Sequence, residues 1–221
     1  GRPGEALEYY ATGAPLRDVF DHTATGAPRS VGVVGLGAGS MAAWLGADDE
    51  IVFYEIDPAV IAIATDPDVF SYLADSPARV EVAEGDGRLA LAADPAVGRH
   101  DLVYIDAFSS DAIPVHLVTR EALAVYRQAL RPEGVVVFHV SNRHFDLRPV
   151  VARLADDAGL VAMTRTARGL VEGSALTTAV AVGPEDRLAG LAEVDGWVRA
   201  EPGLDLWTDE QADVLGALES F

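Results

Sequence analysis

Five short apolar runs, each followed by a segment with helical character, constrain the fold of this chain more than any other feature. The runs are Val31–Gly37, Ile51–Asp57, Val80–Asp86, Asp101–Asp106 and Val135–Asn142. Their apolar, β-branched composition is typical of strands buried on both faces. The segments between them predict helices, so the alternation indicates βαβ units and a parallel sheet. Those helices are expected at Ser40–Leu45, Pro58–Ala64, Ala90–Ala93 and Arg120–Leu130, the last one ended by Pro132 and Gly134.

The last third of the sheet is predicted to differ from the rest. A helix at Leu147–Ala158 precedes two more strands, Val161–Ala167 and Leu176–Gly183. The link between these strands, Arg168–Ala175, is short and contains two glycines, which favours a hairpin. We therefore predict an α/β fold with a doubly wound, mostly parallel, seven-stranded sheet. Its C-terminal antiparallel hairpin resembles that of the class I methyltransferase (Rossmann-like) type.

The amino-acid composition excludes several classes of chemistry and ligand. The 221 residues contain no cysteine, which excludes disulfides and thiolate chemistry and fits a reducing compartment. All 16 basic residues are arginine, so lysine Schiff bases and the P-loop lysine are excluded. The formal charge of −19 disfavours nucleic acid and favours a cationic substrate. No apolar stretch approaches the roughly 20 residues of a membrane span.

The N-terminus suggests an excised piece, because the chain begins at Gly1 without methionine or a signal-like segment. We expect residues 1–30 to be a partial N-terminal edge segment and residues 31–221 to form the catalytic domain. A preceding domain or membrane segments, and a homodimer, are compatible with the sequence.

Ligands of open α/β sheets bind at the carboxyl ends of the strands, so those ends are the candidate site. The first strand ends in a glycine turn, Gly35, Gly37 and Gly39, that leads into a helix, where free N–H groups can meet a ligand. Glu55 lies 20 residues past Gly35, the spacing of an acid that binds ribose hydroxyls. Asp57 precedes Pro58 and reads as a helix N-cap.

Three further acids follow the third and fourth strands. Asp86 lies between two glycines, where it can accept a hydrogen bond from an adenine amino group or close an Asx turn. Asp106 ends a buried run, where an unpaired carboxylate is costly unless it has a use. Asp111 lies in the loop that follows, with Ser109 and Ser110, and either binds an amine or serves as a turn or cap residue.

Taken as a set, these motifs resemble the spermidine synthase (polyamine aminopropyltransferase) family, closest to its bacterial branch fused to membrane transporter-like segments. The likeness runs from Tyr9 to the C-terminus, where Trp207-Thr208-Asp209 adds a further motif. The resemblance implies that the glycine turn holds a sulfonium cofactor, and that Asp106 is catalytic. It also implies roles for the following residues: Glu55 and Ile56 at the ribose side, Asp86 and Gly87 at the adenine side, Asp111 as a second acid, and Tyr9 or Tyr10 as an amine-pocket tyrosine.

Two departures from the family pattern bear on the substrate. The family's glycine loop carries an aspartate that pairs with the aminopropyl ammonium, and Ala38 stands in its place. The loop after Asp106 is longer, with Ala107 and Phe108 inserted. Most of the small β-domain that precedes the catalytic domain in the family is also missing.

Other polar and aromatic residues fit structural roles better. The five histidines show no metal-ligand spacing, and we expect no metal. His139 and Ser141 alternate toward the end of the fifth strand and can line the pocket, although a structural role is favoured. Trp207 is interpreted as a packing anchor beside an acidic, solvated C-terminal helix.

We therefore predict a cytoplasmic aminopropyltransferase that uses decarboxylated S-adenosylmethionine and a small cationic amine such as putrescine. One alternative is a methyltransferase that uses intact S-adenosylmethionine. The other is a non-catalytic nucleotide-sensing domain of a membrane protein.

Overall fold

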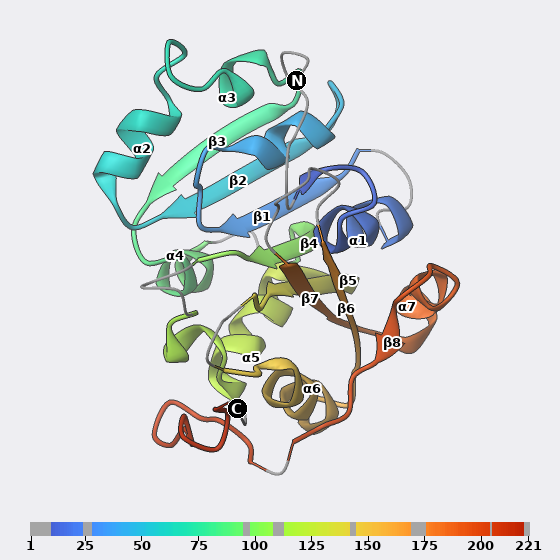
Figure 1. Cartoon of the computed structure of the whole chain (residues 1–221). Coiled ribbons are helices and arrows are strands. Elements are labelled where there is room, and N and C mark those ends of the chain that lie inside the picture. Colours follow the sequence, from blue (N-terminus) through green and yellow to red (C-terminus); the bar gives the residue numbers. More distant parts are fainter. Residues whose placement is uncertain are drawn as a thin grey trace.

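The sheet is the organising element of the molecule (Figure 1). The structure is a computed structural model that describes residues 10–23, 28–94, 98–107, 113–141, 145–168, 176–203 and 205–218. Within these residues eight strands form one mixed sheet in the order β3-β2-β1-β4-β5-β7-β6-β8. The strands are β1 (Ser30–Val34), β2 (Glu50–Glu55), β3 (Arg79–Glu84), β4 (His100–Ile105), β5 (Leu130–His139), β6 (Val161–Arg168), β7 (Leu176–Gly183) and β8 (Val198–Arg199).

The pairing confirms the predicted α/β sheet with an antiparallel C-terminal pair. β1 to β5 are parallel to one another, whereas β7 lies antiparallel between β5 and β6. Two details differ from the prediction. A two-residue strand, β8, extends the sheet to eight by pairing with β6. β3 is not buried on both faces, because it is an edge strand whose side chains alternate between exposed and half-buried.

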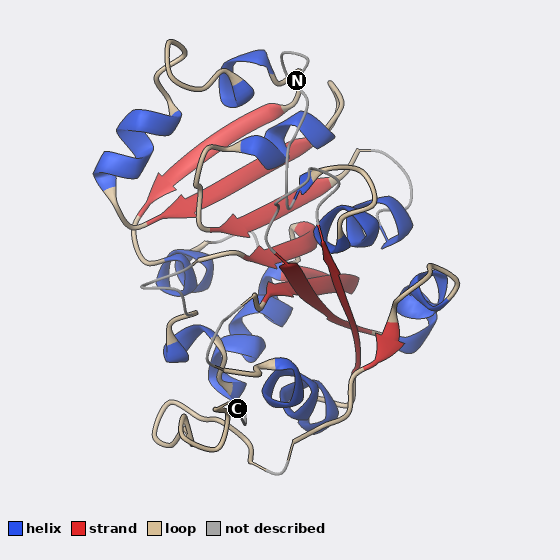
Figure 2. Ribbon diagram, in the orientation of Figure 1, coloured by secondary structure: helices blue, strands red, loops and turns tan. Residues whose placement is uncertain are grey.

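Helices cover both faces of the sheet (Figure 2). One apolar core lies under α4 (Gly87–Ala93), α5 (Arg120–Ala129) and α6 (Arg148–Asp157). The other lies under α1 (Pro15–Thr23), η2 (Ser40–Trp44), α2 (Pro58–Ala64) and α7 (Glu185–Ala192), with Leu73 of α3 (Tyr72–Asp75) packed against it. None of the described helices combines the length and apolar character needed to cross a membrane.

Several helix boundaries depart from the sequence pattern. The segment after the glycine turn is a short 3-10 helix, η2. It begins directly after Gly39, whose backbone is in the left-handed conformation. α5 ends at Ala129, and β5 begins at once, so Pro132 and Gly134 lie inside an irregular strand rather than after a helix. The register of β5 against β4 shifts between His100 and Leu102, which accommodates this irregular start.

α1 is the one described helix before residue 30. Leu16, Val19 and Phe20 on this helix are fully buried against the sheet. The division of the chain at residue 30 stays a prediction.

Strand order reverses between β1 and β4. β1 is followed in sequence by β2 on one side, and β4 lies on its other side. Such a reversal leaves a crevice at the carboxyl ends of the two strands, where open α/β sheets bind ligands. Residues that follow β1 and β4 therefore border the expected binding crevice.

Candidate active site

The backbones that leave β1 and β4 touch at the strand reversal. Asp106 N donates to Val34 O at 2.9 Å, and Gly35 N donates to Tyr54 O at 2.8 Å. Gly35 has a φ of 103°, and a Cβ atom added to it would lie 2.5 Å from the carbonyl oxygen of Asp106. Only glycine fits here, because both the positive φ and the close approach exclude a side chain.

The rest of the glycine turn is shaped by packing against neighbouring elements. Gly37 (φ 54°) is exposed with open space around it, whereas a side chain on Gly39 would collide with Leu73. Ala38 between them is half-buried. The turn therefore presents Gly37 and Ala38 toward solvent while Gly35 and Gly39 hold it in place.

Glu55 connects the glycine turn to the end of β2. Its Oε2 accepts a hydrogen bond from Leu36 N at 3.0 Å, and its Oε1 accepts one from Asp57 N at 2.9 Å. Asp57 in turn caps α2 by accepting from Ala59 N, as its position before Pro58 predicts. Each carboxylate oxygen of Glu55 keeps a lone pair for a further donor, so this structural role leaves it able to bind a ligand.

Asp86 caps a helix with one carboxylate oxygen and faces a histidine with the other. Its Oδ1 accepts from Leu89 N at 3.0 Å and so caps α4. Its Oδ2 lies 3.1 Å from Nε2 of His116, a residue that the sequence did not connect with this site. The next residue, Gly87, packs closely against β1, since a Cβ atom added to it would lie 2.5 Å from Val34 Cγ1.

Apolar side chains stand in solvent beside these acids. Ile56 is 66% exposed, and Leu89 is 68% exposed. They follow the ends of β2 and β3, which pair directly in the sheet. Large apolar side chains left in water beside polar groups are typical of a surface that binds a flat, partly apolar ligand.

Asp106 is the centre of the most connected cluster at the crevice. Tyr10 Oη donates to Asp106 Oδ2 at 2.5 Å, and His139 Nδ1 lies 2.7 Å from Asp106 Oδ1. His139 Nε2 lies 2.8 Å from Ser141 Oγ, which also accepts from Thr178 N at 2.8 Å. The carboxylate of Asp106 is 9% exposed. The acid that the sequence placed on a buried strand end thus has partners on both of its oxygens.

The C-terminal segment, residues 205–218, contacts the elements that border the candidate site near Asp86. Asp209 accepts two hydrogen bonds from the Arg88 guanidinium, at 2.7 and 2.6 Å, and one from Thr119 Oγ1. The hydrogen bonds from Arg88 lower the pKa of Asp209 to about 2. Arg88 also donates to the carbonyl of His116, in η3 (Val115–Leu117). The segment therefore fixes the turn that carries His116 toward Asp86.

Two interpretations of the C-terminal segment have different outcomes. Trp207 is buried in the core, as expected of a packing anchor. The predicted acidic helix is wrong, because the described residues of 205–218 form turns rather than a helix. Side chains stabilise these turns instead: Asp213 Oδ1 accepts from Gly216 N, and Thr208 Oγ1 accepts from Gln211 N.

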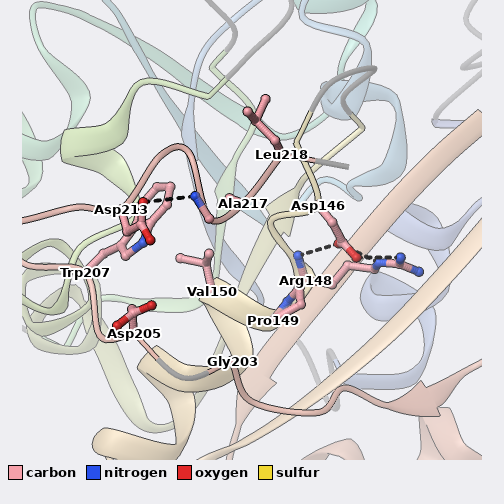
Figure 3. A pocket seen from close by; sticks show the side chains of 11 residues that line it. Asp146, Arg148, Pro149, Val150, Gly203, Asp205, Trp207, Asp213, Ala217 and Leu218 are labelled. Carbon is pink, nitrogen blue, oxygen red and sulfur yellow. Dashed lines mark hydrogen bonds and ion pairs between the residues drawn. The ribbon is translucent and has the colours of Figure 1, made fainter. Parts of the chain in front are cut away.

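A cavity of about 450 Å³ lies between the start of α6 and the C-terminal segment (Figure 3). Asp146 and Arg148 form an ion pair on one side of it, and Trp207 lies on the other. None of the predicted site residues that the structure describes lines this cavity.

Part of the predicted site cannot be placed. Tyr9, Ser109, Ser110 and Asp111 lie outside the described residues. Within the described part of the chain, no group of three or more His, Asp or Glu side chains is arranged to hold a metal ion.

Known proteins share this architecture. A probable spermidine synthase from Corynebacterium glutamicum ATCC 13032 superposes with a TM-score of 0.63 at 18% identity, over 90% of this chain and 78% of the other. The fold is that of the spermidine synthases. A spermidine synthase in complex with the transition state analogue AdoDATO has a TM-score of 0.54 at 15% identity, over 91% of this chain and 67% of the other.

The spermidine synthase fold is shared with methyltransferases. Human methyltransferase-like protein 13, in complex with SAH, has a TM-score of 0.54 at 23% identity, over 78% of this chain and 86% of the other. The fold therefore resembles that of a methyltransferase-like structure, as predicted, although the sheet has eight strands and not seven.

The sequence itself is similar to a curated relative over part of its length. A polyamine aminopropyltransferase of Vibrio vulnificus (strain CMCP6) is 33% identical over 114 residues, which are 50% of this chain and 37% of that protein. The chain thus matches little more than a third of the length of this relative. No protein-family model matches the chain.

Proposed function

We propose that this chain is an aminopropyltransferase that moves an aminopropyl group from decarboxylated S-adenosylmethionine to a small amine such as putrescine. The observation that carries the proposal is the Asp106 carboxylate, held by Tyr10 and His139 directly beside the Gly35 turn. A fixed anion at the strand reversal suits an amine substrate, and the sheet matches that of spermidine synthases. The similarity to a polyamine aminopropyltransferase supports the same activity.

The residues at the strand ends fit the nucleoside part of such a cofactor. The glycine turn lets the backbone approach a ligand closely, since side chains are absent from Gly35, Gly37 and Gly39. Glu55 and Asp86 keep lone pairs that can accept from ribose hydroxyls and from an adenine amino group. The exposed side chains of Ile56 and Leu89 offer an apolar surface for the ring.

The chemistry that the cofactor supplies is a sulfonium leaving group. The amine nitrogen forms a bond to the adjacent carbon, the C–S bond breaks, and its electron pair stays on sulfur, which departs as neutral methylthioadenosine. The leaving group needs no acid. The nucleophile needs help, because an alkylamine resembles lysine, with a pKa of about 10.4, and is mostly protonated near pH 7.

Asp106 is the residue that we propose to serve this need. Its carboxylate binds the ammonium, orients the nitrogen and takes the proton that the nitrogen must lose. General base catalysis of this kind contributes about 10²–10⁴-fold to a rate. Tyr10, which donates to the same carboxylate, borders the amine, and Asp111 is proposed as the second acid.

A methyltransferase is the second candidate, because of Ala38. Intact S-adenosylmethionine carries a carboxylate that an acid at this position would repel, and Ala38 removes that repulsion. The likeness to a methyltransferase-like protein in complex with SAH agrees with this alternative.

Product analysis separates the candidates. The protein is incubated with putrescine and either decarboxylated or intact S-adenosylmethionine, and the products are identified by mass spectrometry. Methylthioadenosine with an aminopropylated amine supports the proposal, whereas S-adenosylhomocysteine with a methylated product supports the alternative. Binding of methylthioadenosine in calorimetry without turnover of either cofactor would indicate a non-catalytic sensor.

The partners and location follow from this activity as proposals. The chain has 35 acidic and 16 basic residues, and this excess of negative charge favours a cationic substrate over nucleic acid. A homodimer, a cytoplasmic location, and a preceding domain or fused membrane segments remain predictions.

A further inference from the structure

Behind Asp106, a chain of hydrogen bonds runs away from the crevice into the sheet. It passes from Asp106 to His139, then to Ser141, and ends at the backbone N–H of Thr178. The contacts measure 2.7, 2.8 and 2.8 Å. The aminopropyl transfer proposed above uses the contact of His139 with Asp106 but assigns no task to Ser141 or Thr178.

The direction of these hydrogen bonds follows from the groups at the two ends. A carboxylate can only accept, so Nδ1 of His139 donates to Asp106 Oδ1. Nε2 of the neutral imidazole then accepts, and the hydroxyl of Ser141 donates to it. Thr178 N can only donate, so it takes a lone pair of Ser141 Oγ and leaves the hydroxyl proton for His139.

The sheet supplies the fixed end of this chain. Val140 N donates to Thr178 O at 2.9 Å, which continues the antiparallel pairing of His139 with Ala179. Thr178 N is therefore held in register against the end of β5. The inserted antiparallel strand β7 therefore holds Ser141 Oγ where its hydroxyl can donate to His139 Nε2.

We infer that His139 is a positioning residue that holds the Asp106 carboxylate in one orientation, toward the amine. The inference rests on the proposed aminopropyl transfer. With Tyr10 on Oδ2 and His139 on Oδ1, the carboxylate cannot turn without breaking a charge-assisted hydrogen bond. One lone pair on each oxygen remains for the substrate ammonium.

The same three side chains have the order of a serine hydrolase triad, with Ser141 in the place of the nucleophile. In both roles the serine hydroxyl donates to the histidine. Here the hydrogen bond from Thr178 N also occupies a lone pair of Ser141 Oγ and ties that atom to the sheet, which favours a structural serine. Labelling of Ser141 by a fluorophosphonate probe would overturn the inference, because His139 would then serve the serine.

The first test reads the tautomer of His139 directly and needs no activity. In ¹⁵N-histidine-labelled protein, long-range ¹H–¹⁵N spectra distinguish Nδ1–H from Nε2–H imidazoles. We expect the signal that H139N removes to show the Nδ1–H pattern. H100N is the matched control, since His100 is also buried beside a serine and a tyrosine but lies at the opposite end of β4. An Nε2–H pattern for His139 overturns the inference, whatever the enzyme does.

The second test separates positioning from proton transfer. In H139N the amide N–H₂ stands near the place of Nδ1–H and still donates to Asp106, whereas H139L has no donor. We expect kcat to fall about 10-fold or more in H139L, the effect of losing a hydrogen bond to a charged group, and to stay within about threefold of wild type in H139N.

Each result of this second test has one meaning. Equal losses in H139N and H139L overturn positioning, because only a proton carrier would be needed at residue 139. Retained activity in a folded H139L also overturns it. Melting temperatures and methylthioadenosine binding check that both variants fold. A wild-type protein with no aminopropyl transfer would refute the proposed function, while the tautomer measurement would still decide the orientation of His139.

Discussion

At the scale of single residues, Asp106 shows how a buried carboxylate is satisfied by hydrogen bonds. Among the described residues, Tyr10 and His139 donate to its two oxygens. Its place between the ends of β1 and β4 gives the charge direct access to the crevice. The carboxylate is thus satisfied before substrate arrives and still has lone pairs to offer.

Asp106→Asn should therefore reduce activity without unfolding the protein. The amide keeps one acceptor for His139, and the Tyr10 hydroxyl can turn to accept from the new N–H₂ group. We expect turnover to fall at least about 100-fold, with little change in melting temperature. A large drop in melting temperature would instead assign Asp106 a structural role.

Ala38 is expected to control the choice of cofactor. Without an acid there, intact and decarboxylated S-adenosylmethionine should bind within roughly tenfold of each other, a difference below about 1.4 kcal/mol. A38D should restore preference for the decarboxylated form, because the new carboxylate repels the carboxylate of the intact cofactor. Calorimetric titration of both cofactors measures this. A hundredfold preference of the unmodified protein for the decarboxylated cofactor would show that another acid makes the selection, and Asp111 would be the first candidate.

His100 gives the stability a pH dependence of its own. Burial, and next the charge of Arg99, lower the pKa of His100 to about 4 from its ordinary value of 6.5. Below pH 6.5 the unfolded chain binds a proton that the folded chain does not, so stability falls as the pH falls toward 4. The loss amounts to roughly 3 kcal/mol.

Urea unfolding of the wild type and of H100N, followed from pH 7 to pH 4.5, tests this dependence. H100N should be less stable at pH 7, because His100 packs against Gly32, but its stability should change less with pH. Parallel curves for the two proteins would contradict the prediction.

At the scale of elements, the turn after β1 joins two strand ends and one helix. Glu55 ties it to β2, Gly35 touches the backbone after β4, and Gly39 packs on Leu73 of α3. The positions of the site residues thus depend on backbone contacts in this turn more than on side chains.

Gly35→Ala should disturb both stability and activity. The added Cβ meets the Asp106 carbonyl at 2.5 Å in a left-handed backbone, so we expect a loss of about 2 kcal/mol or more. Gly37→Ala is the control, since Gly37 also has a positive φ but open space around it, and its loss should stay near 1 kcal/mol. Denaturant unfolding measures both. Equal losses would show that the contact with Asp106 is easily relieved.

At the scale of the whole molecule, the C-terminal segment connects distant parts of the chain. Asp209 contacts Arg88, which lies 121 residues earlier, and Arg120 N donates to Trp207 O. Asp209, Arg88 and His116 then lead to Asp86 at the candidate site. The end of the chain therefore supports the wall of the crevice.

Asp209→Ala should loosen this wall. Because Asp209 is partly exposed, we expect a stability loss of only about 1–2 kcal/mol, together with weaker methylthioadenosine binding. The wild-type interaction should persist at pH 5 and weaken as the pH falls from 3.8 toward 2, since the pKa of Asp209 is lowered to about 2. Glu185→Gln is the control, because it removes only the exposed ion pair with Arg199. Unchanged nucleoside binding in Asp209→Ala would separate the segment from the site.

Much of the fold was predictable because its signals are local. β7 has the predicted bounds, α2 begins at the predicted Pro58 after its Asp57 cap, and the turn after β1 needs glycine at the predicted place. The sequence predicted a helix after Gly39 but not its 3-10 conformation, nor the close packing of Gly39 against Leu73, which lies 34 residues later. Likewise, the apolar pattern of β3 did not show that it is an edge strand.

By itself, the sequence determined the order of most strands and helices, the glycine turn after β1 and the acids at the ends of β2, β3 and β4. Apolar periodicity, helix caps and turn residues act within a few positions, so they can be read along the chain. Only the tertiary structure decided which groups meet. Tyr10 reaches Asp106 across 96 residues, His139 across 33, and Arg88 meets Asp209 across 121. The physical reason is that strand order and register, set by packing of the whole sheet, decide which distant side chains become neighbours.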